Sequence, residues 1–138
     1  MNLRLTVRRY FRFIVVAAVL ALVSMVVLEM IGWLFPYKDP VVHGAIVTLV
    51  YLAGVFVNYH LQRLWVFQIR ARPGFVRYAL WMITSAMIVG LVAGLVFDVL
   101  MDRVPTLPLL SSISLAVALA LVSPLTFSGV ALIMRGKV

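Results

Sequence analysis

The sequence predicts an all-α integral membrane protein, with four transmembrane helices arranged as two helical hairpins in one domain over residues 1–138. Three observations predict this fold class. Hydrophobic residues make up 65% of the chain and charged residues only 12%, which is more apolar surface than a soluble domain of this size can bury. The apolar residues fall into four runs, each long enough as a helix to cross roughly 30 Å of hydrocarbon. The runs are apolar on every side, whereas the strands of a membrane barrel alternate.

Three proline-containing breaks that also carry charge separate the four expected spans: "PYKDP" at 36–40, "RARPG" at 70–74 and "DRVPTLP" at 102–108. The first run is too long for the apolar core of a cleaved signal peptide, so we expect a full span there. Gly90 and Gly94 form a GxxxG pair, which favours close helix packing. The expected spans are 13–35, 42–66, 78–101 and 109–134.

The two halves of the chain resemble each other. "YFRFIVVAAV" at 10–19 and "FVRYALWMIT" at 75–84 share the order aromatic, any residue, Arg, aromatic just before an apolar run. Each is followed by a helix, a polar break and a second helix. Residues 10–67 and 75–135 are therefore candidate two-helix repeats, an architecture found in transporters.

The formal net charge is +8, from twelve basic and four acidic residues. Because the basic residues lie between apolar runs, they indicate membrane topology and contact with anionic lipid headgroups, and no nucleic-acid partner is expected. Two of the basic residues, Lys38 and Arg103, lie on one side of the membrane and ten on the other. The positive-inside rule therefore places the side with ten basic residues, and with it both termini, in the cytoplasm. The ten basic residues of the other side are Arg4, Arg8, Arg9, Arg12, Arg63, Arg70, Arg72, Arg77, Arg135 and Lys137.

The second span ends in "NYHLQRLWVF" at 58–67. On a helix of about 100° per residue, Asn58, Gln62, Tyr59 and Arg63 share one polar sector. An arginine at the bilayer centre costs at least about 2.5–3.5 kcal/mol, so lipid exposure of this sector is unfavourable. Two interpretations stay open: a helix end that reaches the headgroups with Trp65 as an interfacial anchor, or an anion pocket that opens to the cytoplasmic leaflet.

Few residues are candidates for chemistry. Glu29 and Asp98 are carboxylates near the outer ends of their spans, where solvation, proton coupling and contact with sugar hydroxyls all stay open. The chain has no cysteine, and His43 and His60 are single and distant, so no metal site and no cofactor are expected. No acid–base or nucleophile–base pair is apparent. We therefore do not expect an enzyme.

With these motifs the chain resembles the GtrA-like family of small four-helix membrane proteins. "RRYFRFIVVAA" opens the first span, and the aromatic–Arg start of the third span follows a basic loop. Ala17 stands where the family typically has glycine, and the last span keeps only Phe127 and terminal basic residues of its usual motif. The family pattern of Asn, an aromatic, Arg and Trp-x-Phe is matched by Asn58, Tyr59, Arg63, Trp65 and Phe67.

The resemblance implies a multi-pass flippase in the inner membrane of a prokaryote. It would move a polyprenyl-phosphate-linked monosaccharide from the cytoplasmic to the outer leaflet for glycosylation of cell-envelope polysaccharides. A membrane glycosyltransferase is then an expected partner, and a homodimer an expected assembly. The implied residues are Arg12, Arg63, Arg70 and Arg77 for the phosphate, Asn58, Tyr59, Gln62 and Trp65 for the sugar, and Glu29 and Asp98 on the outer side.

Two other classes of function stay open. The first is a non-transporting subunit that anchors or regulates a glycosyltransferase, which would not need the polar sector of the second span. The second is a small proton-coupled multidrug transporter. That class relies on a glutamate near the middle of its first span, whereas Glu29 lies near the outer end. Its cationic substrates would also be repelled by a face with ten basic residues.

Overall fold

The computed structural model describes residues 3–69 and 74–135, and all regular structure within them is helical. α1, α4 and α5 are long and apolar enough to cross a membrane. α2 and α3 with its π-helical extension η1 form a further apolar pair, bent by 46°. By length and composition, the described residues thus hold three spans, or four if the bent pair is one broken span. The elements are α1 (Leu3–Leu34), α2 (Pro40–Ala53), α3 (Val55–Leu61), η1 (Gln62–Val66), α4 (Phe75–Arg103) and α5 (Leu110–Arg135).

α1 begins at Leu3, well before the start of the expected span at residue 13. The segment contains no proline, and its only glycine, Gly32, is near its end, so nothing in the basic stretch interrupts the helix. Its 32 residues extend over about 48 Å, which exceeds the roughly 30 Å hydrocarbon core of a bilayer. The arginines of the first turns are therefore part of the same helix as the apolar residues.

The second apolar run is bent at Gly54, where the sequence predicted one unbroken helix. The Gly54 N–H donates to the carbonyl of Tyr51 at 3.2 Å, a tighter turn than an α-helix makes. Glycine interrupts helices readily because it lacks a side chain to restrict its backbone. The start of the run is well specified, since Asp39 accepts a hydrogen bond from the Val41 N–H at 2.8 Å and Pro40 occupies the first turn.

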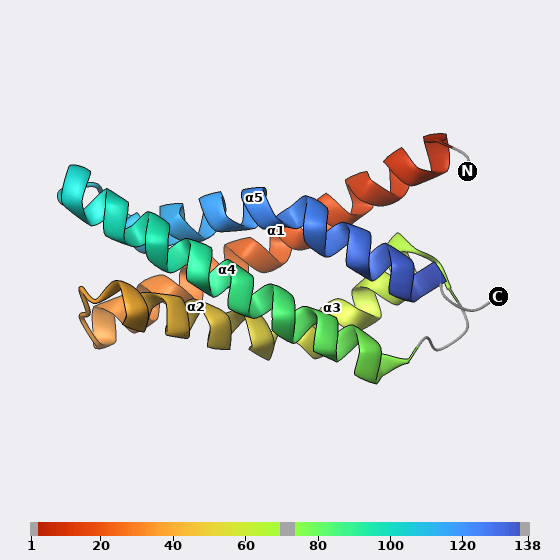
Figure 1. Cartoon of the computed structure of the whole chain (residues 1–138), viewed down its shortest axis with the longest axis horizontal. Helices are drawn as coiled ribbons and strands as arrows, with labels where there is room; N and C mark the ends of the chain where they lie inside the picture. The colour runs from red at the N-terminus through yellow and green to blue at the C-terminus, as the bar shows by residue number, and fades with distance from the viewer. Residues whose placement is uncertain (1–2, 70–73, 136–138) are drawn as a thin grey trace.

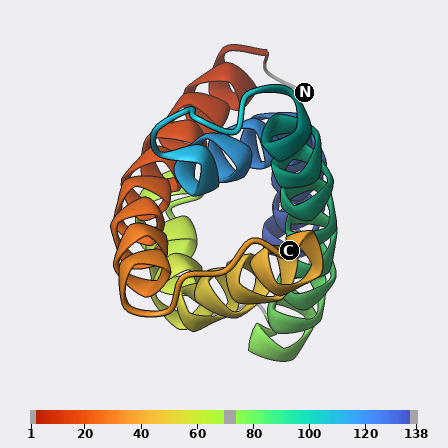
Figure 2. The ribbon, with the colours of Figure 1, turned by 90° about the vertical axis from the view of Figure 1, so that its left-hand side faces the viewer.

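The start of α1 and the end of α5 lie at the same end of the molecule (Figure 1), which we call the terminal end; η1 and the start of α4 lie there too. The opposite end holds the α1–α2 turn at 35–39 and the α4–α5 turn at 104–109. Viewed along the long axis, α1, α5, α4 and α2–α3 follow one another around a ring (Figure 2). α4 packs closely on α2 and α5, whereas α1 lies mainly against α5 and η1.

The closest helix contact joins α2 to α4 through three glycines. A Cβ on Gly44 would lie 2.7 Å from the carbonyl oxygen of Gly90, and one on Gly94 would lie 2.9 Å from that of Pro40. Thr48 fills the space beside Gly90 and donates to the Gly44 carbonyl at 2.8 Å. Small residues let backbones approach in this way, as the GxxxG pair predicts. α2 and α4 thus form the tightly packed side of the ring.

We predict that Gly44→Ala destabilises the protein by about 1–3 kcal/mol, because the new Cβ would push the two backbones apart. Thermal unfolding in detergent, followed by circular dichroism, measures this effect. Gly32→Ala is the matched control: a Cβ there meets nothing within 4 Å, and alanine is the better helix former. A Gly44→Ala protein as stable as Gly32→Ala would contradict the close contact.

Candidate functional site

A cavity of about 580 Å³ lies between α1, α2–α3 and α5. We call it the lateral cavity. Several of its lining residues are exposed on the protein surface, namely Val23 and Val27 on α1 and Leu49 and Val57 on α2–α3. The cavity therefore opens sideways between α1 and α2–α3, through a rim of apolar side chains. Its wall is mostly apolar, and its polar lining residues are Ser24, Tyr51, Asn58, Gln62 and Thr126.

Asn58 and Gln62, the amide pair, line this cavity on successive turns. The Gln62 side-chain nitrogen donates to Asn58 Oδ1 at 3.1 Å. Gln62 is only 1% exposed, and its Oε1 has no hydrogen-bond partner among the described residues. A buried acceptor without a donor costs about 1–3 kcal/mol. The vacant acceptor therefore favours a ligand that brings a hydroxyl or amine into the cavity.

The chain leaves α3 through the π-helical turn η1. The Phe67 N–H donates to the carbonyl of Gln62 at 2.9 Å, five residues back. Arg12 of α1 donates from Nη1 to the Trp65 carbonyl at 3.1 Å, and its guanidinium lies 5.9 Å from the centre of the Trp65 ring. Single π turns cost hydrogen-bond regularity and occur frequently at functional sites. Arg12 compensates by occupying a carbonyl at the negative end of the helix.

Tyr59 and Arg63 lie on a different side of α3–η1 from the amide pair. Tyr59 is buried against α4, with its ring 5.1 Å from that of Tyr78. The Arg63 guanidinium lies 6.0 Å from the Tyr59 ring centre, and Arg63 Nε is buried without a hydrogen-bond partner in the described part of the chain. The polar sector expected from the sequence is thus divided between the cavity and α4.

The remaining residues predicted for the terminal end vary in their setting. Trp65 is 43% exposed beneath Arg12. Arg77 is exposed in the first turn of α4, with no side-chain hydrogen bond to another described residue. Arg70 lies outside the described residues. The structure therefore brings Arg12 to Trp65 and Arg63 to Tyr59, and leaves Arg77 directed to the surroundings.

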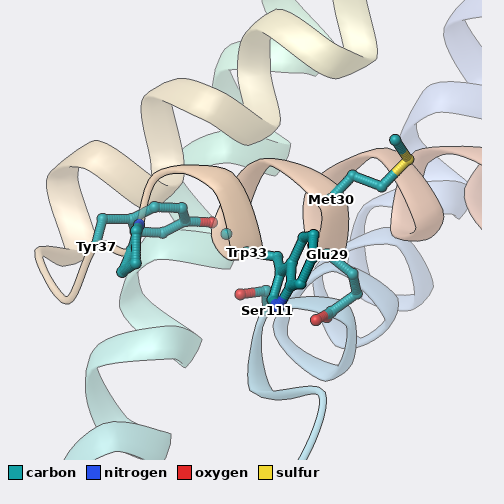
Figure 3. A pocket seen from close by; sticks show the side chains of 7 residues that line it. Glu29, Met30, Trp33, Tyr37 and Ser111 are labelled. Carbon is teal, nitrogen blue, oxygen red and sulfur yellow. The ribbon is translucent and has the colours of Figure 1, made fainter.

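At the opposite end, Glu29 lines a second hollow of about 580 Å³, which we call the opposite-end pocket. Glu29 Oε1 accepts a hydrogen bond from Ser112 Oγ at 2.7 Å. Figure 3 shows Glu29, Trp33 and Ser111 gathered at one side of this pocket, with the Tyr37 hydroxyl directed towards them. Asp98, predicted as a second outer-side residue, is exposed on α4 and does not line the pocket.

From the sequence, His43 was considered only as a metal ligand, and that role was not expected. It is fully buried, at 0% exposed, and both ring nitrogens are paired: Nδ1 with the Tyr37 hydroxyl at 3.0 Å and Nε2 with Ser114 Oγ at 2.7 Å. Its ring stacks on Phe97, with 4.3 Å between centres. His43 therefore joins the α1–α2 turn, α4 and α5. Ser114 is 71 positions away in the sequence, so no local pattern could have indicated this contact.

Comparisons with protein-family models, curated proteins and solved structures found no match. The resemblance to the GtrA-like family therefore stays a prediction from the motifs. Across residues 3–69 and 74–135 there is also no group of three or more His, Cys, Asp or Glu side chains placed to hold a metal ion.

We predict that Arg12→Met loosens the π turn, because the Trp65 carbonyl loses its charged donor. The amides of Phe67 and Ile69, which bond to Gln62 and Arg63, should exchange about 5- to 30-fold faster, as expected for a loss of about 1–2 kcal/mol. Hydrogen exchange in nanodiscs measures this change. Arg8→Met, one turn earlier on an exposed side of α1, is the control, and equal exchange in both variants would contradict the role of Arg12.

Proposed function

We propose that this protein moves a polyprenyl-phosphate-linked monosaccharide from the cytoplasmic to the outer leaflet of a prokaryotic inner membrane. One observation carries the proposal: an apolar cavity, open sideways between two helices, contains a buried amide with a vacant acceptor close to arginine-bearing turns. A lipid-linked sugar has the matching parts. Its sugar supplies hydroxyl donors, its phosphate is an anion, and its long apolar tail needs no shelter from the bilayer.

The charge distribution supports the proposed orientation. Arginines gather at the terminal end, with Arg12 and Arg63 on α1 and η1 and Arg77 at the start of α4. The carboxylates Glu29 and Asp98 lie towards the opposite end, near the two turns. The positive-inside rule then places the terminal end in the cytoplasm. A phosphate is attracted to that end and repelled at the other, which favours outward delivery of the head.

Arg63 is the best candidate for the phosphate. Its Nε is buried and has no hydrogen-bond partner among residues 3–69 and 74–135, and a guanidinium fork matches two phosphate oxygens. Tyr59 holds the guanidinium through its ring face, so part of the ordering of the side chain precedes ligand binding. Arg12 of α1 bonds to the same turn through the Trp65 carbonyl, and adds a second positive charge.

The amide pair is suited to the sugar. Gln62 Oε1 accepts from a sugar hydroxyl, and Asn58 presents the second amide at the cavity wall. The cavity volume of about 580 Å³ falls within the range of about 300–1,000 Å³ that is common for small-molecule sites. The sideways opening lets the head enter while the tail stays among lipid tails, so only the polar head has to be shielded.

We predict that Gln62→Leu lowers sugar-lipid transport by at least about tenfold, since one buried hydrogen bond of about 1.4 kcal/mol corresponds to that factor. Its melting temperature should change little, because the variant removes an unpaired buried acceptor together with the donor to Asn58 Oδ1. The assay places labelled polyprenyl-phosphate sugars in one leaflet of proteoliposomes and follows their exposure on the other. Thr84→Val is the control, because Thr84 bonds only within α4.

Two outcomes would contradict the proposal. Transport by Gln62→Leu at the wild-type rate would remove the cavity from the pathway. No transport of any sugar lipid by folded wild-type protein would favour the alternative of a non-transporting subunit that binds a glycosyltransferase.

We also predict that Arg63→Ala lowers transport about tenfold or more, and that Arg63→Lys restores only part of it, because lysine keeps the charge without the two-pronged geometry. The same flip assay measures both variants. Arg4→Ala provides the control for lost positive charge, since Arg4 is exposed at the start of α1. Equal losses for Arg63→Ala and Arg4→Ala would indicate a general effect of charge rather than a phosphate site.

A further inference from the structure

The opposite-end pocket lies between the last turns of α1, the α1–α2 turn and the start of α5. It is separate from the lateral cavity, because the two share no lining residue. Its chemistry is also different. The polar groups are a carboxylate and hydroxyls, and among the described residues no lysine, arginine or histidine lines it. The lining residues are Glu29, Met30, Gly32, Trp33, Pro36, Tyr37 and Ser111.

The hydrogen bonds around His43 fix the direction in which Tyr37 donates. Ser114 Oγ donates to the Ser111 carbonyl at 2.7 Å, so it accepts the bond from His43 Nε2–H. In a neutral imidazole with its proton on Nε2, Nδ1 is an acceptor. The Tyr37 hydroxyl therefore donates to Nδ1. The lone pairs of its oxygen are left to accept hydrogen bonds, one of them from the neighbouring Ser111 hydroxyl.

Tyr37 keeps its proton under ordinary conditions. Burial raises the pKa of its phenol above the usual value of 10.0, the neighbouring Ser111 hydroxyl lowers it, and the charge of Glu29 raises it further. Tyr37 is thus a positioned hydroxyl that stays protonated and directs its hydrogen bond to His43 Nδ1. His43 in turn is held by Ser114 and Phe97, which makes it a positioning residue for the pocket.

Glu29 contributes further acceptors. Ser112 occupies one lone pair of Oε1, and the described residues give the carboxylate no other hydrogen bond. An ionised carboxylate has about four acceptor positions, so most of them remain available to a ligand. The pocket therefore combines several acceptors with few donors, and it selects a ligand that carries several O–H groups.

Trp33 adds a flat apolar surface beside these acceptors. Its side chain is 86% exposed and lines the pocket together with Met30. A pyranose ring has one face of C–H groups and a rim of hydroxyls, so it can stack on an indole while its hydroxyls reach Glu29 and Tyr37. A quaternary ammonium ion has no N–H donor and would leave the acceptors unused.

The charge of this end discourages a phosphate. The described charged side chains near the two turns are the carboxylates of Glu29, Asp39, Asp98 and Asp102 and the cations of Lys38 and Arg103. The carboxylates outnumber the cations, and one of them lines the pocket itself. An anion that enters is repelled with an energy that rises as water is excluded.

We infer that the opposite-end pocket is a second sugar-binding site, which holds the hydroxyl groups of the head through Glu29 and Tyr37, stacks it on Trp33 and rejects its phosphate. This inference rests on the proposed function, because it makes the pocket the place where the sugar arrives on the outer side. The sugar then passes from a site beside arginines to a site beside carboxylates. The repelled phosphate is directed to the headgroup region, which favours release.

The test uses soluble methyl glycosides of common hexoses and the full chain in nanodiscs, with saturation-transfer NMR as the readout. It is made in the Gln62→Leu background, so that the amide pair does not contribute. We expect Glu29→Gln and Trp33→Leu each to weaken glycoside binding by at least about fivefold. Phe35→Leu should leave it unchanged, because Phe35 is equally close to the end of α1, is exposed, and does not line the pocket.

Tyr37→Phe tests the positioning by His43. It should weaken glycoside binding about threefold or more. It should lower the melting temperature less than His43→Leu does, because His43→Leu leaves Ser114 without its buried donor. Equal effects of the two variants on stability and on binding would make the Tyr37–His43 contact merely structural and overturn that part of the inference.

The remaining outcomes separate the second site from the proposed function. Absent glycoside binding, or binding that Glu29→Gln and Trp33→Leu leave unchanged, overturns the site even if the protein transports sugar lipids. Displacement of the glycoside by millimolar tetramethylammonium also overturns it, in favour of a cation site. Glycoside binding that depends on Glu29 and Trp33, in a protein that transports no sugar lipid, supports the site and overturns the proposed function.

Discussion

Polar groups within a bilayer must find their partners in the protein, and this constraint organises the structure. Most hydroxyl side chains of the helices bond to a carbonyl one turn back, as Thr48 does to Gly44 and Ser128 to Pro124. Arg12 bonds to the Trp65 carbonyl between two helices. Among the described residues, three buried side-chain atoms lack a hydrogen-bond partner: Tyr78 Oη, Gln62 Oε1 and Arg63 Nε. The last two lie on adjacent residues of η1. Buried polar groups that cost free energy while unpaired are suited to a ligand that supplies their partners.

The ring of helices has a tight side and a loose side. α4 is fixed to α2 by the contact of Gly44 with Gly90, and to α5 by Trp81, whose indole N–H donates to the Thr126 carbonyl at 3.3 Å. α1 lies more loosely against α2, and the lateral cavity opens between these two elements. A head group that enters sideways therefore meets the side with the least packing to disrupt, while the tight side keeps the amide pair in place.

Parts of the candidate site follow from the sequence, and parts do not. Asn58 and Gln62 are one turn apart, so any helix through them puts both amides on one face, and both line the cavity. Tyr59 was expected in the same polar sector, yet it packs on Tyr78 of α4. The helical period gives the angle between side chains around α3. Which side of α3 faces the cavity depends on the helices that pack against it. His43 became a candidate only when Ser114 and Tyr37 were found at its two nitrogens.

The sequence by itself determined the membrane class, the approximate spans and the concentration of arginines at one end. These properties depend on composition and on the order of apolar and charged residues along the chain, which any helical arrangement preserves. Only the tertiary structure decided that the second run bends at Gly54, that the cavity opens beside α1, and that Glu29, Tyr37 and Ser111 share a pocket. These features depend on contacts between segments far apart in the chain. Such contacts are set by how whole helices pack, so no local pattern encodes them.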